Sequence, residues 1–184
     1  MYAYWLILGG LWAVFIAVWF VGALSTKRTV HRSWGSIWWR VGIAASVIVL
    51  VNLLWGSPYI TGAVPIPTLN IVGLILAALG IVLAIWARVY LGRNWGMPQV
   101  VKEHPTLVTT GPYAYIRHPI YAGILTALFG SGFVIWWWFV VFAWSLVYFL
   151  AFAMPDEEAL LQKEFPDTYP AYRARTKRLI PFVW

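Results

Sequence analysis

Two polar clusters in the second half of the chain carry residue types that can do chemistry. The segment Thr106–Gly123 places Tyr113, Arg117 and His118 between long apolar runs, and Asp156-Glu157-Glu158 follows the next apolar run. Such side chains are costly to keep beside membrane segments, so they usually serve a function. A carboxylate pair suits a cationic ligand such as an amino group or a sulfonium, and a guanidinium suits a carboxylate.

Each cluster also has a simpler interpretation when it is taken alone. Arg117 and Tyr113 are residue types that commonly flank membrane helices, as an orienting cation and an interface aromatic. Glu157-Glu158 is also typical of a solvated first helical turn. The remaining sequence offers no Gly-rich dinucleotide motif, P-loop or serine elbow.

The composition indicates an integral membrane protein. The chain is 62% hydrophobic and 10% charged, against about 25% charged in soluble domains. There is no cysteine, which excludes disulfides, thiolate metal sites and cysteine nucleophiles, and the three histidines lack the tight spacing of a metal site. The net charge of +7 comes from Lys and Arg beside apolar runs, which favours contact with anionic lipid over nucleic acid.

The elements that must position these clusters are membrane helices. The apolar runs Tyr4–Leu24, Ile37–Trp55 and Leu69–Tyr90 are each long enough to cross a bilayer. The run Ile120–Ala153 is too long for one span and too short for two full ones, and Gly130-Ser131-Gly132 is a natural break in it. We therefore expect an all-α integral membrane fold with five transmembrane helices. The last two would form a helical hairpin with a short first arm.

One membrane domain, residues 1–184, accounts for the whole chain. It comprises three spans in 1–90, a cofactor loop in 91–119, the hairpin in 120–153 and a tail in 154–184 whose amphipathic helix would lie on the membrane. Individual aromatic side chains of the tail could still fold back over the loops. The first and third loops are basic and the second is neutral. By the positive-inside rule, the N-terminus is expected outside, and the cofactor loop and C-terminus in the cytoplasm.

Together the segments resemble the isoprenylcysteine carboxyl methyltransferase and phospholipid methyltransferase superfamily. The matching segments are Leu107-Val108-Thr109-Thr110-Gly111-Pro112-Tyr113, Arg117-His118-Pro119-Ile120-Tyr121-Ala122-Gly123, the pair Glu157-Glu158, and Tyr169, Tyr172 and Pro181 in the tail. Two positions depart from the family pattern. His104 stands three residues before Leu107 rather than two, and Pro166 replaces a common glycine.

The resemblance implies an S-adenosylmethionine-dependent methyltransferase acting on a lipid-like or isoprenylated acceptor that enters from the bilayer. It implies Arg117 and Glu158 as catalytic residues, no metal, and a donor site formed by Leu107, Val108, Gly111, Tyr113, His118, Tyr121, Glu157, Glu158 and Tyr172. A carboxylate acceptor would need no general base. An amine acceptor would need a carboxylate or His118 in that role.

Two other functions stay open at this point. A membrane sterol-type reductase would bind NADPH with a similar C-terminal region, and a non-enzymatic scaffold or transporter would use the same motifs only to fold. The sequence identifies neither the acceptor nor the oligomeric state, and it does not decide which glutamate contacts the donor.

Overall fold

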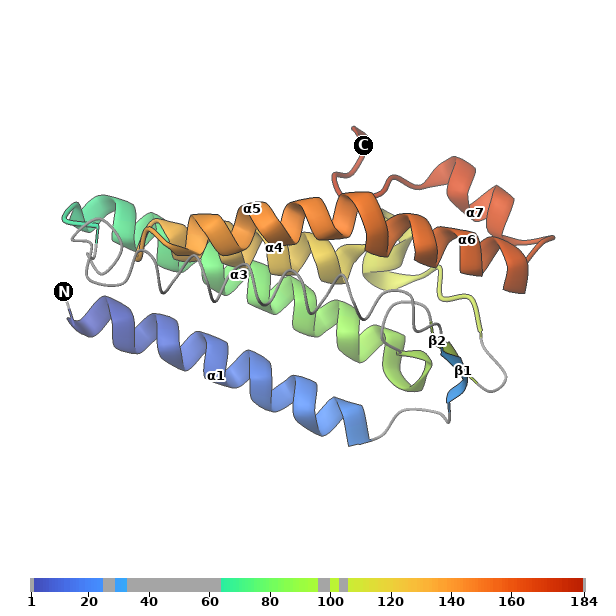
Figure 1. Ribbon diagram of the computed structural model, residues 1–184, viewed down its shortest axis with the longest axis horizontal. Coiled ribbons are helices and arrows are strands. Elements are labelled where there is room, and N and C mark those ends of the chain that lie inside the picture. The colour runs from blue at the N-terminus through green and yellow to red at the C-terminus, as the bar shows by residue number, and fades with distance from the viewer. Residues whose placement is uncertain (1, 25–28, 33–63, 96–99, 103–105, 184) are drawn as a thin grey trace.

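The structure, a computed structural model, describes residues 2–24, 29–32, 64–95, 100–102 and 106–183 (Figure 1). Its elements are α1 (Tyr2–Leu24), β1 (Thr29–Arg32), α3 (Pro67–Leu91), η1 (Gly92–Asn94), β2 (Val100–Lys102), η2 (Gly111–Ala114), α4 (Pro119–Gly132), α5 (Trp138–Tyr148), η3 (Phe149–Ala153), α6 (Met154–Glu164) and α7 (Tyr169–Arg175).

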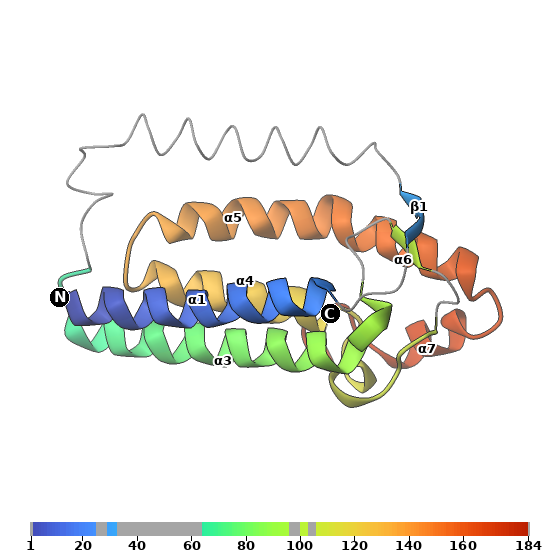
Figure 2. The same ribbon diagram turned by 90° about the horizontal axis from the view of Figure 1, so that it is seen from below.

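The long helices lie side by side along the long axis of the molecule, and α6, α7 and the strand pair gather at one end of it (Figures 1 and 2). Within the described residues, three helical stretches are long and apolar enough to cross a membrane: Tyr2–Leu24, Pro67–Asn94 and Trp138–Glu164. The first and third predicted spans are therefore confirmed as helices. The predicted span Ile37–Trp55 lies outside the described residues.

Small residues let α3 and α4 pack backbone against backbone. A Cβ added to Gly123 would stand 2.6 Å from the carbonyl oxygen of Gly80, and one added to Gly130 would stand 2.6 Å from that of Gly73. Ala77 lies between these contacts and is fully buried. Such small-residue spacing brings membrane helices into close contact without a hydrophobic driving force. The α3–α4 pair is thus the rigid centre on which the loop between them is mounted.

The structure contains the predicted helical hairpin, but the Gly130-Ser131-Gly132 triplet forms the last turn of its first helix and the break follows at residues 133–137. Helix α4 ends at Gly132 and α5 begins at Trp138. The predicted end of the second arm at Ala153 is wrong, because the helix continues through η3 into α6 as far as Glu164. The η3 turn is π-helical. This wider turn allows Pro155, which lacks an N–H and crowds the preceding turn, to enter without ending the helix.

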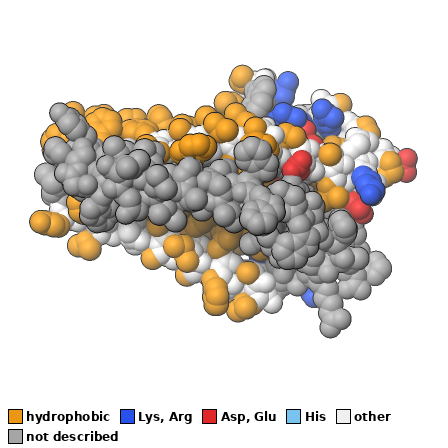
Figure 3. All heavy atoms as spheres, in the orientation of Figure 1, with side chains coloured by type: hydrophobic (Ala, Val, Ile, Leu, Met, Phe, Trp, Pro, Cys, Tyr) orange, Lys and Arg blue, Asp and Glu red, His pale blue; other side chains and the backbone are white. Residues whose placement is uncertain are grey.

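On the face seen in Figure 3, apolar side chains of the described residues extend along most of the molecular length, and charged side chains gather around α6 and α7. On α1, Leu6 is 76% exposed and Phe20 is 69% exposed. Exposed apolar side chains along a helix long enough to span are the expected lipid-facing surface. The chain is accordingly an integral membrane protein.

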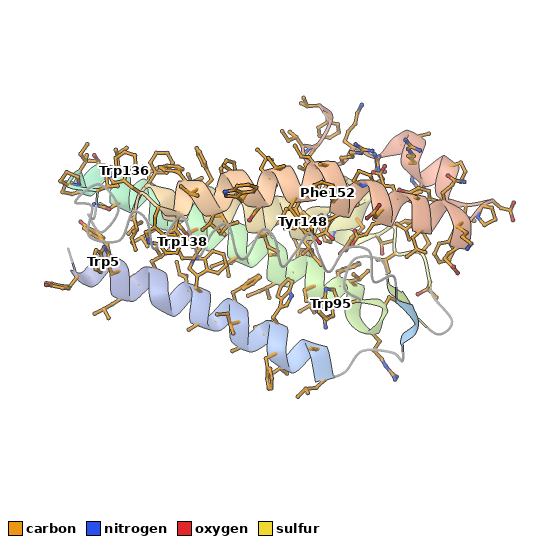
Figure 4. The ribbon with its side chains drawn as sticks, in the orientation of Figure 1. Trp5, Trp95, Trp136, Trp138, Tyr148 and Phe152 are labelled. Carbon is orange, nitrogen blue, oxygen red and sulfur yellow. The ribbon has the colours of Figure 1, made fainter. Side chains whose placement is uncertain are left out.

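Aromatic side chains join α1 to the rest of the bundle. The Trp12 and Trp138 rings stack at 5.1 Å, and the Trp12 indole N–H donates a 3.1 Å hydrogen bond to the Ser131 hydroxyl. Figure 4 shows Trp138 directed from α5 towards α1, and Trp95 beside the end of α3. The Trp19 ring meets the Trp95 ring edge-on. These tryptophans therefore stabilise helix contacts in addition to any role at the lipid–water interface.

Arg88 closes the other end of the α1–α3 contact. Its guanidinium donates hydrogen bonds to the carbonyl oxygens of Gly22, near the end of α1, and Gly92, just after α3, and it lies 4.4 Å from the Trp95 ring centroid. Helix C-termini carry partial negative charge, so they stabilise a buried cation. Arg88 is only 3% exposed, and it therefore fixes how the two helices meet.

Two features differ from the predicted all-α fold. The helical class is confirmed, but β1 and β2 also form a short antiparallel pair in which His31 lies opposite Val101. The amphipathic tail helix was predicted to rest on the membrane, yet Tyr169 and Tyr172 on α7 are 0% and 3% exposed. The apolar face of α7 is therefore buried against the protein. Sequence periodicity alone does not distinguish a protein-facing stripe from a lipid-facing one.

Candidate functional site

The loop before α4 is held against the end of α3. Gly111 has a positive φ of 59°, and an added Cβ there would stand 2.6 Å from the Tyr90 ring. Only glycine meets both conditions without strain. The 3-10 turn that follows buries Tyr113, whose hydroxyl lies 3.4 Å from the carbonyl oxygen of Ala87. Gly111 and Tyr113 thus fix where the loop meets the α3–α4 pair.

Helix α4 begins where the predicted site residues are concentrated. Pro119 is the first helical residue and His118 is the N-cap, which suits the fixed backbone angle of proline. This arrangement places Arg117 and His118 at the end of the helix and Tyr121 in its first turn. The His118 and Tyr121 rings stack at 5.5 Å, and Tyr121 stacks at 4.3 Å on Phe149 of the π-helical turn.

The Glu158 carboxylate is the centre of the buried charge cluster. Its Oε1 accepts from Arg117 Nε at 2.9 Å and Arg178 Nε at 3.1 Å and lies 3.3 Å from His118 Nε2, while its Oε2 accepts from Arg178 at 2.9 Å. The Glu158 side chain is 5% exposed. Three positively charged or protonatable partners therefore compensate the cost of burying this carboxylate.

Glu157 differs from its neighbour in exposure and in partners. Its Oε1 accepts a 2.5 Å hydrogen bond from the Tyr121 hydroxyl, and its Oε2 lies 3.4 Å from His118 Nδ1. The Glu157 side chain is 27% exposed. The two consecutive glutamates thus flank the His118 ring, one at each nitrogen, and Glu157 is the one that solvent reaches.

The contacts of His118 favour its positively charged form. Burial alone would lower its pKa, but hydrogen bonds and charge attraction to Glu157 and Glu158 outweigh burial and raise the pKa above the ordinary value. Both ring nitrogens face carboxylates, so the doubly protonated form of the ring can donate to both. The described cluster then has two cationic side chains, Arg117 and Arg178, and the protonatable His118 around two carboxylates.

The tail closes over this cluster through its backbone. The N–H of Arg117 donates to the carbonyl of Lys177 at 2.7 Å, and the N–H of His118 donates to that of Arg178 at 3.0 Å. The Arg117 guanidinium also donates to the carbonyls of Arg173 and Thr176. Arg117 therefore joins α4, α6 and the tail.

A second line of contacts runs through the tail tyrosines. The Tyr172 hydroxyl donates a 2.8 Å hydrogen bond to the Tyr113 carbonyl, and the Thr176 hydroxyl donates to the Tyr172 carbonyl at 2.7 Å. Burial raises the pKa of Tyr172 to about 12, so its hydroxyl stays neutral. The Tyr169 hydroxyl is buried too, but in the described part of the chain it has no hydrogen-bond partner.

The structure brings most of the predicted site residues together. Five of them share the charge cluster directly: Arg117, His118, Tyr121, Glu157 and Glu158. Tyr113 and Tyr172 are hydrogen-bonded to each other beside it, and Gly111 shapes the loop. Leu107 and Val108 are half-buried in the segment ahead of η2. His104 lies outside the described residues.

Sequence reasoning missed Arg178 and Tyr169 as members of the site. Arg178 belongs to the basic run Arg173–Arg178, which is equally typical of headgroup contact. Its bidentate pairing with Glu158 depends on the tail folding back, which no local pattern reports. Tyr169 was part of the family pattern, but no separate role was predicted for it.

The charges in this cluster fit the amino-acid group of S-adenosylmethionine. That group carries an ammonium and a carboxylate, and the cluster offers a partly exposed carboxylate at Glu157 beside an excess of cationic side chains. Carboxylate–ammonium and guanidinium–carboxylate pairs are the strong hydrogen-bonded pairs of proteins. Among the residues that the structure describes, no three His, Asp or Glu side chains could hold a metal ion.

Comparison with known families agrees with this geometry. Residues 68–168, more than half of the chain, match the family described as phospholipid methyltransferase. The chain belongs to the phospholipid methyltransferase family. The matched region of this family runs from α3 through the loop and the hairpin to the end of α6. It therefore contains both residues of the Arg117–Glu158 ion pair.

Three curated proteins are similar to this chain. The cobalt-zinc-cadmium resistance protein CzcN of Cupriavidus metallidurans is 29% identical over 150 residues, which cover 77% of this chain and 63% of that protein. The protein-S-isoprenylcysteine O-methyltransferase of Schizosaccharomyces pombe is 36% identical over 84 residues, covering 45% and 35%. Protein-S-isoprenylcysteine O-methyltransferase B of Arabidopsis thaliana is 32% identical over 115 residues, covering 60% and 58%. The chain therefore spans less than two thirds of the length of each of these relatives.

Proposed function

We propose that this protein is an integral membrane S-adenosylmethionine-dependent methyltransferase that acts on a lipid-like acceptor. The observation that carries the proposal is the buried cluster in which Arg117, His118, Glu157 and Glu158 meet at the polar end of the hairpin. Two segments far apart in the chain, each part of the family pattern, supply it. Membership of the phospholipid methyltransferase family supports the same reaction.

Within this proposal the two glutamates have different roles. Glu157 takes the ammonium of the donor, because it is partly exposed and each of its oxygens has only one partner among the described contacts. Glu158 is already surrounded by three cationic partners and acts as a positioning residue for Arg117 and His118. The predicted catalytic role of Arg117 remains part of the proposal, with its guanidinium orienting a carboxylate.

The donor supplies a methyl group activated by a sulfonium. The chain's own contribution is then to hold two reactants in line and to keep water away from them. Tyr121 and Tyr113, both buried, provide aromatic surface beside the cluster. Aromatic faces attract a cationic centre such as a sulfonium.

The contacts of His118 favour one class of acceptor. An imidazole whose two nitrogens both face carboxylates has no free nitrogen with which to remove a proton from an acceptor, and Glu158 is occupied by its cationic partners. An acceptor that is already an anion, such as the carboxylate of an isoprenylated cysteine, needs no base. An ammonium acceptor would need one. Two relatives named as isoprenylcysteine O-methyltransferases support the carboxylate class.

The acceptor is proposed to enter from the bilayer, and the cluster to face the cytoplasm. Apolar side chains cover the helices that lead to the charged end of the molecule (Figure 3). A lipid-like acceptor can therefore stay in the membrane while its polar end reaches the cluster. The cytoplasmic orientation rests on the basic loops of the sequence.

Calorimetry of the purified protein with S-adenosylhomocysteine and, separately, with NADPH tests the proposal. We expect saturable binding of S-adenosylhomocysteine only. Binding of NADPH alone would support a membrane reductase instead, and binding of neither would support a scaffold or transporter. Glu157→Gln is the matched variant, because it removes the exposed carboxylate and keeps Glu158; it should weaken S-adenosylhomocysteine binding.

A further inference from the structure

Tyr169 stands out within the site because its hydroxyl is buried and has no hydrogen-bond partner among the residues that the structure describes. The residue is 0% exposed and lies on α7 beside Tyr172, at a ring-centroid distance of 6.1 Å. A buried polar group without a partner costs about 1–3 kcal/mol. The other tail tyrosine avoids this cost, because the Tyr172 hydroxyl donates to the Tyr113 carbonyl. The unpaired hydroxyl of Tyr169 therefore requires an explanation.

The charges and hydrogen bonds around this hydroxyl indicate which kind of ligand group it could bind. Tyr169 interacts electrostatically with Glu158 and Arg117, and burial raises the pKa of its hydroxyl above the ordinary range. The hydroxyl is therefore neutral and can donate its proton in a hydrogen bond. The Glu158 carboxylate already accepts from Arg117 and Arg178, which leaves an incoming ligand group as the natural acceptor.

Charge indicates that this ligand group is anionic. The cluster holds Arg117, Arg178 and the protonatable His118 against two carboxylates, so a further carboxylate would find cationic partners in it. A cationic group would be placed better at Glu157, on the partly exposed side.

We propose that the Tyr169 hydroxyl donates a hydrogen bond to the carboxylate of the methyl donor's amino-acid group, next to Arg117. This inference rests on the proposed function and assigns a donor-binding role to a residue of the tail. Because Tyr169 is fully buried in the structure, the tail has to move before the donor can reach it.

The test compares two ligands on the full-length protein by calorimetry. One is S-adenosylhomocysteine; the other is its decarboxylated analogue, which keeps the nucleoside, the thioether and the amine. Tyr169→Phe is expected to weaken S-adenosylhomocysteine binding about tenfold to a hundredfold, as for loss of a hydrogen bond to a charged group. Affinity for the decarboxylated analogue should stay within about twofold, because that ligand lacks the accepting group.

Tyr172→Phe is the matched control on the same helix. It removes a hydroxyl that is hydrogen-bonded within the protein, so it should lower the thermal stability of the ligand-free protein. Tyr169→Phe removes an unpaired hydroxyl and should leave that stability unchanged or raise it. The thermal stability of the two ligand-free variants thus distinguishes a hydroxyl that stabilises the fold from one that binds the donor.

Three results would overturn the assignment. They are equal affinity of wild type and Tyr169→Phe for S-adenosylhomocysteine, an equal loss for both ligands, and a lowered stability of the ligand-free Tyr169→Phe variant. Each would refute the role of Tyr169 while leaving the methyltransferase proposal intact, provided that the wild type binds S-adenosylhomocysteine. A wild type that does not bind S-adenosylhomocysteine would refute the proposed function itself.

Discussion

Replacing Glu158 by Gln should destabilise the protein far more than replacing Glu157 by Gln, although the two residues are adjacent. The Glu158 side chain is 5% exposed and contacts Arg117, His118 and Arg178. The amide keeps one acceptor oxygen but loses the negative charge. Three cationic groups then lose the carboxylate that compensates them. Breaking a buried ion pair by removing one partner costs about 3–5 kcal/mol.

That loss converts into a measurable temperature shift. For a protein of this size, 1 kcal/mol shifts Tm by about 2–4 °C, so Glu158→Gln should lower Tm by roughly 6–20 °C. Glu157 is 27% exposed and accepts one hydrogen bond from Tyr121. Its replacement should cost about 1 kcal/mol and lower Tm by roughly 2–4 °C.

Thermal unfolding of both variants in the same detergent is the assay, with S-adenosylhomocysteine affinity measured in parallel. Glu157→Gln should keep its fold and lose affinity, whereas Glu158→Gln should lose stability first. Equal Tm values for Glu158→Gln and wild type would refute the reasoning, because they would show that the buried charge cluster contributes nothing to the fold.

Three further changes test other parts of the structure. Gly80→Leu should cost about 3 kcal/mol, because the larger side chain forces α3 away from α4. Gly9→Leu is the control and should leave Tm unchanged, because no atom of the described residues lies within 4 Å of an added Cβ there. Similar melting curves for the two variants would contradict the close packing of α3 and α4. The pKa of His118 is raised in the folded protein, so its contribution to the free energy of unfolding is complete below about pH 6.5 and is lost as pH rises through the folded pKa. His118→Gln should therefore make Tm fall less steeply as pH rises. An unchanged dependence of Tm on pH would contradict the ion pairs of His118 with Glu157 and Glu158. Arg178→Gln removes the bidentate contact with Glu158 and should speed limited proteolysis of the tail, whereas an unchanged cleavage rate would show that this contact does not hold the tail closed.

The parts of the fold that follow from local sequence were predictable. The spans at Tyr4–Leu24 and Leu69–Tyr90 are long uninterrupted apolar runs, and the hairpin break that follows Gly130-Ser131-Gly132 has a local backbone signal in that triplet. The meeting of Arg117 with Glu158 was also within reach. The second arm of a hairpin runs back to the end at which the first arm began. Arg117 stands just before the first arm and Glu158 near the end of the second, so the opposite charges meet.

The parts that depend on distant contacts were not predictable in the same way. The tail pattern fits a membrane surface as well as a protein surface, so neither the burial of Tyr169 nor the pairing of Arg178 with Glu158 has a local signal. The close α3–α4 packing did leave a signal, in the small residues Gly73, Ala77 and Gly80, which recur on one side of α3. The pairing of β1 with β2 left none, because both strands are short.

The central claim is that the cluster between α4 and α6 binds a methyl donor for transfer to a membrane acceptor. The most direct measurement incubates the purified protein, reconstituted in vesicles with a lipid extract, with S-adenosylmethionine labelled in its methyl group. We predict label in a lipid-soluble product with wild type and its loss with Glu157→Gln. Absence of labelled product with a folded wild type that binds the donor, across extracts containing isoprenylated carboxylates and phospholipid amines, would contradict the claim.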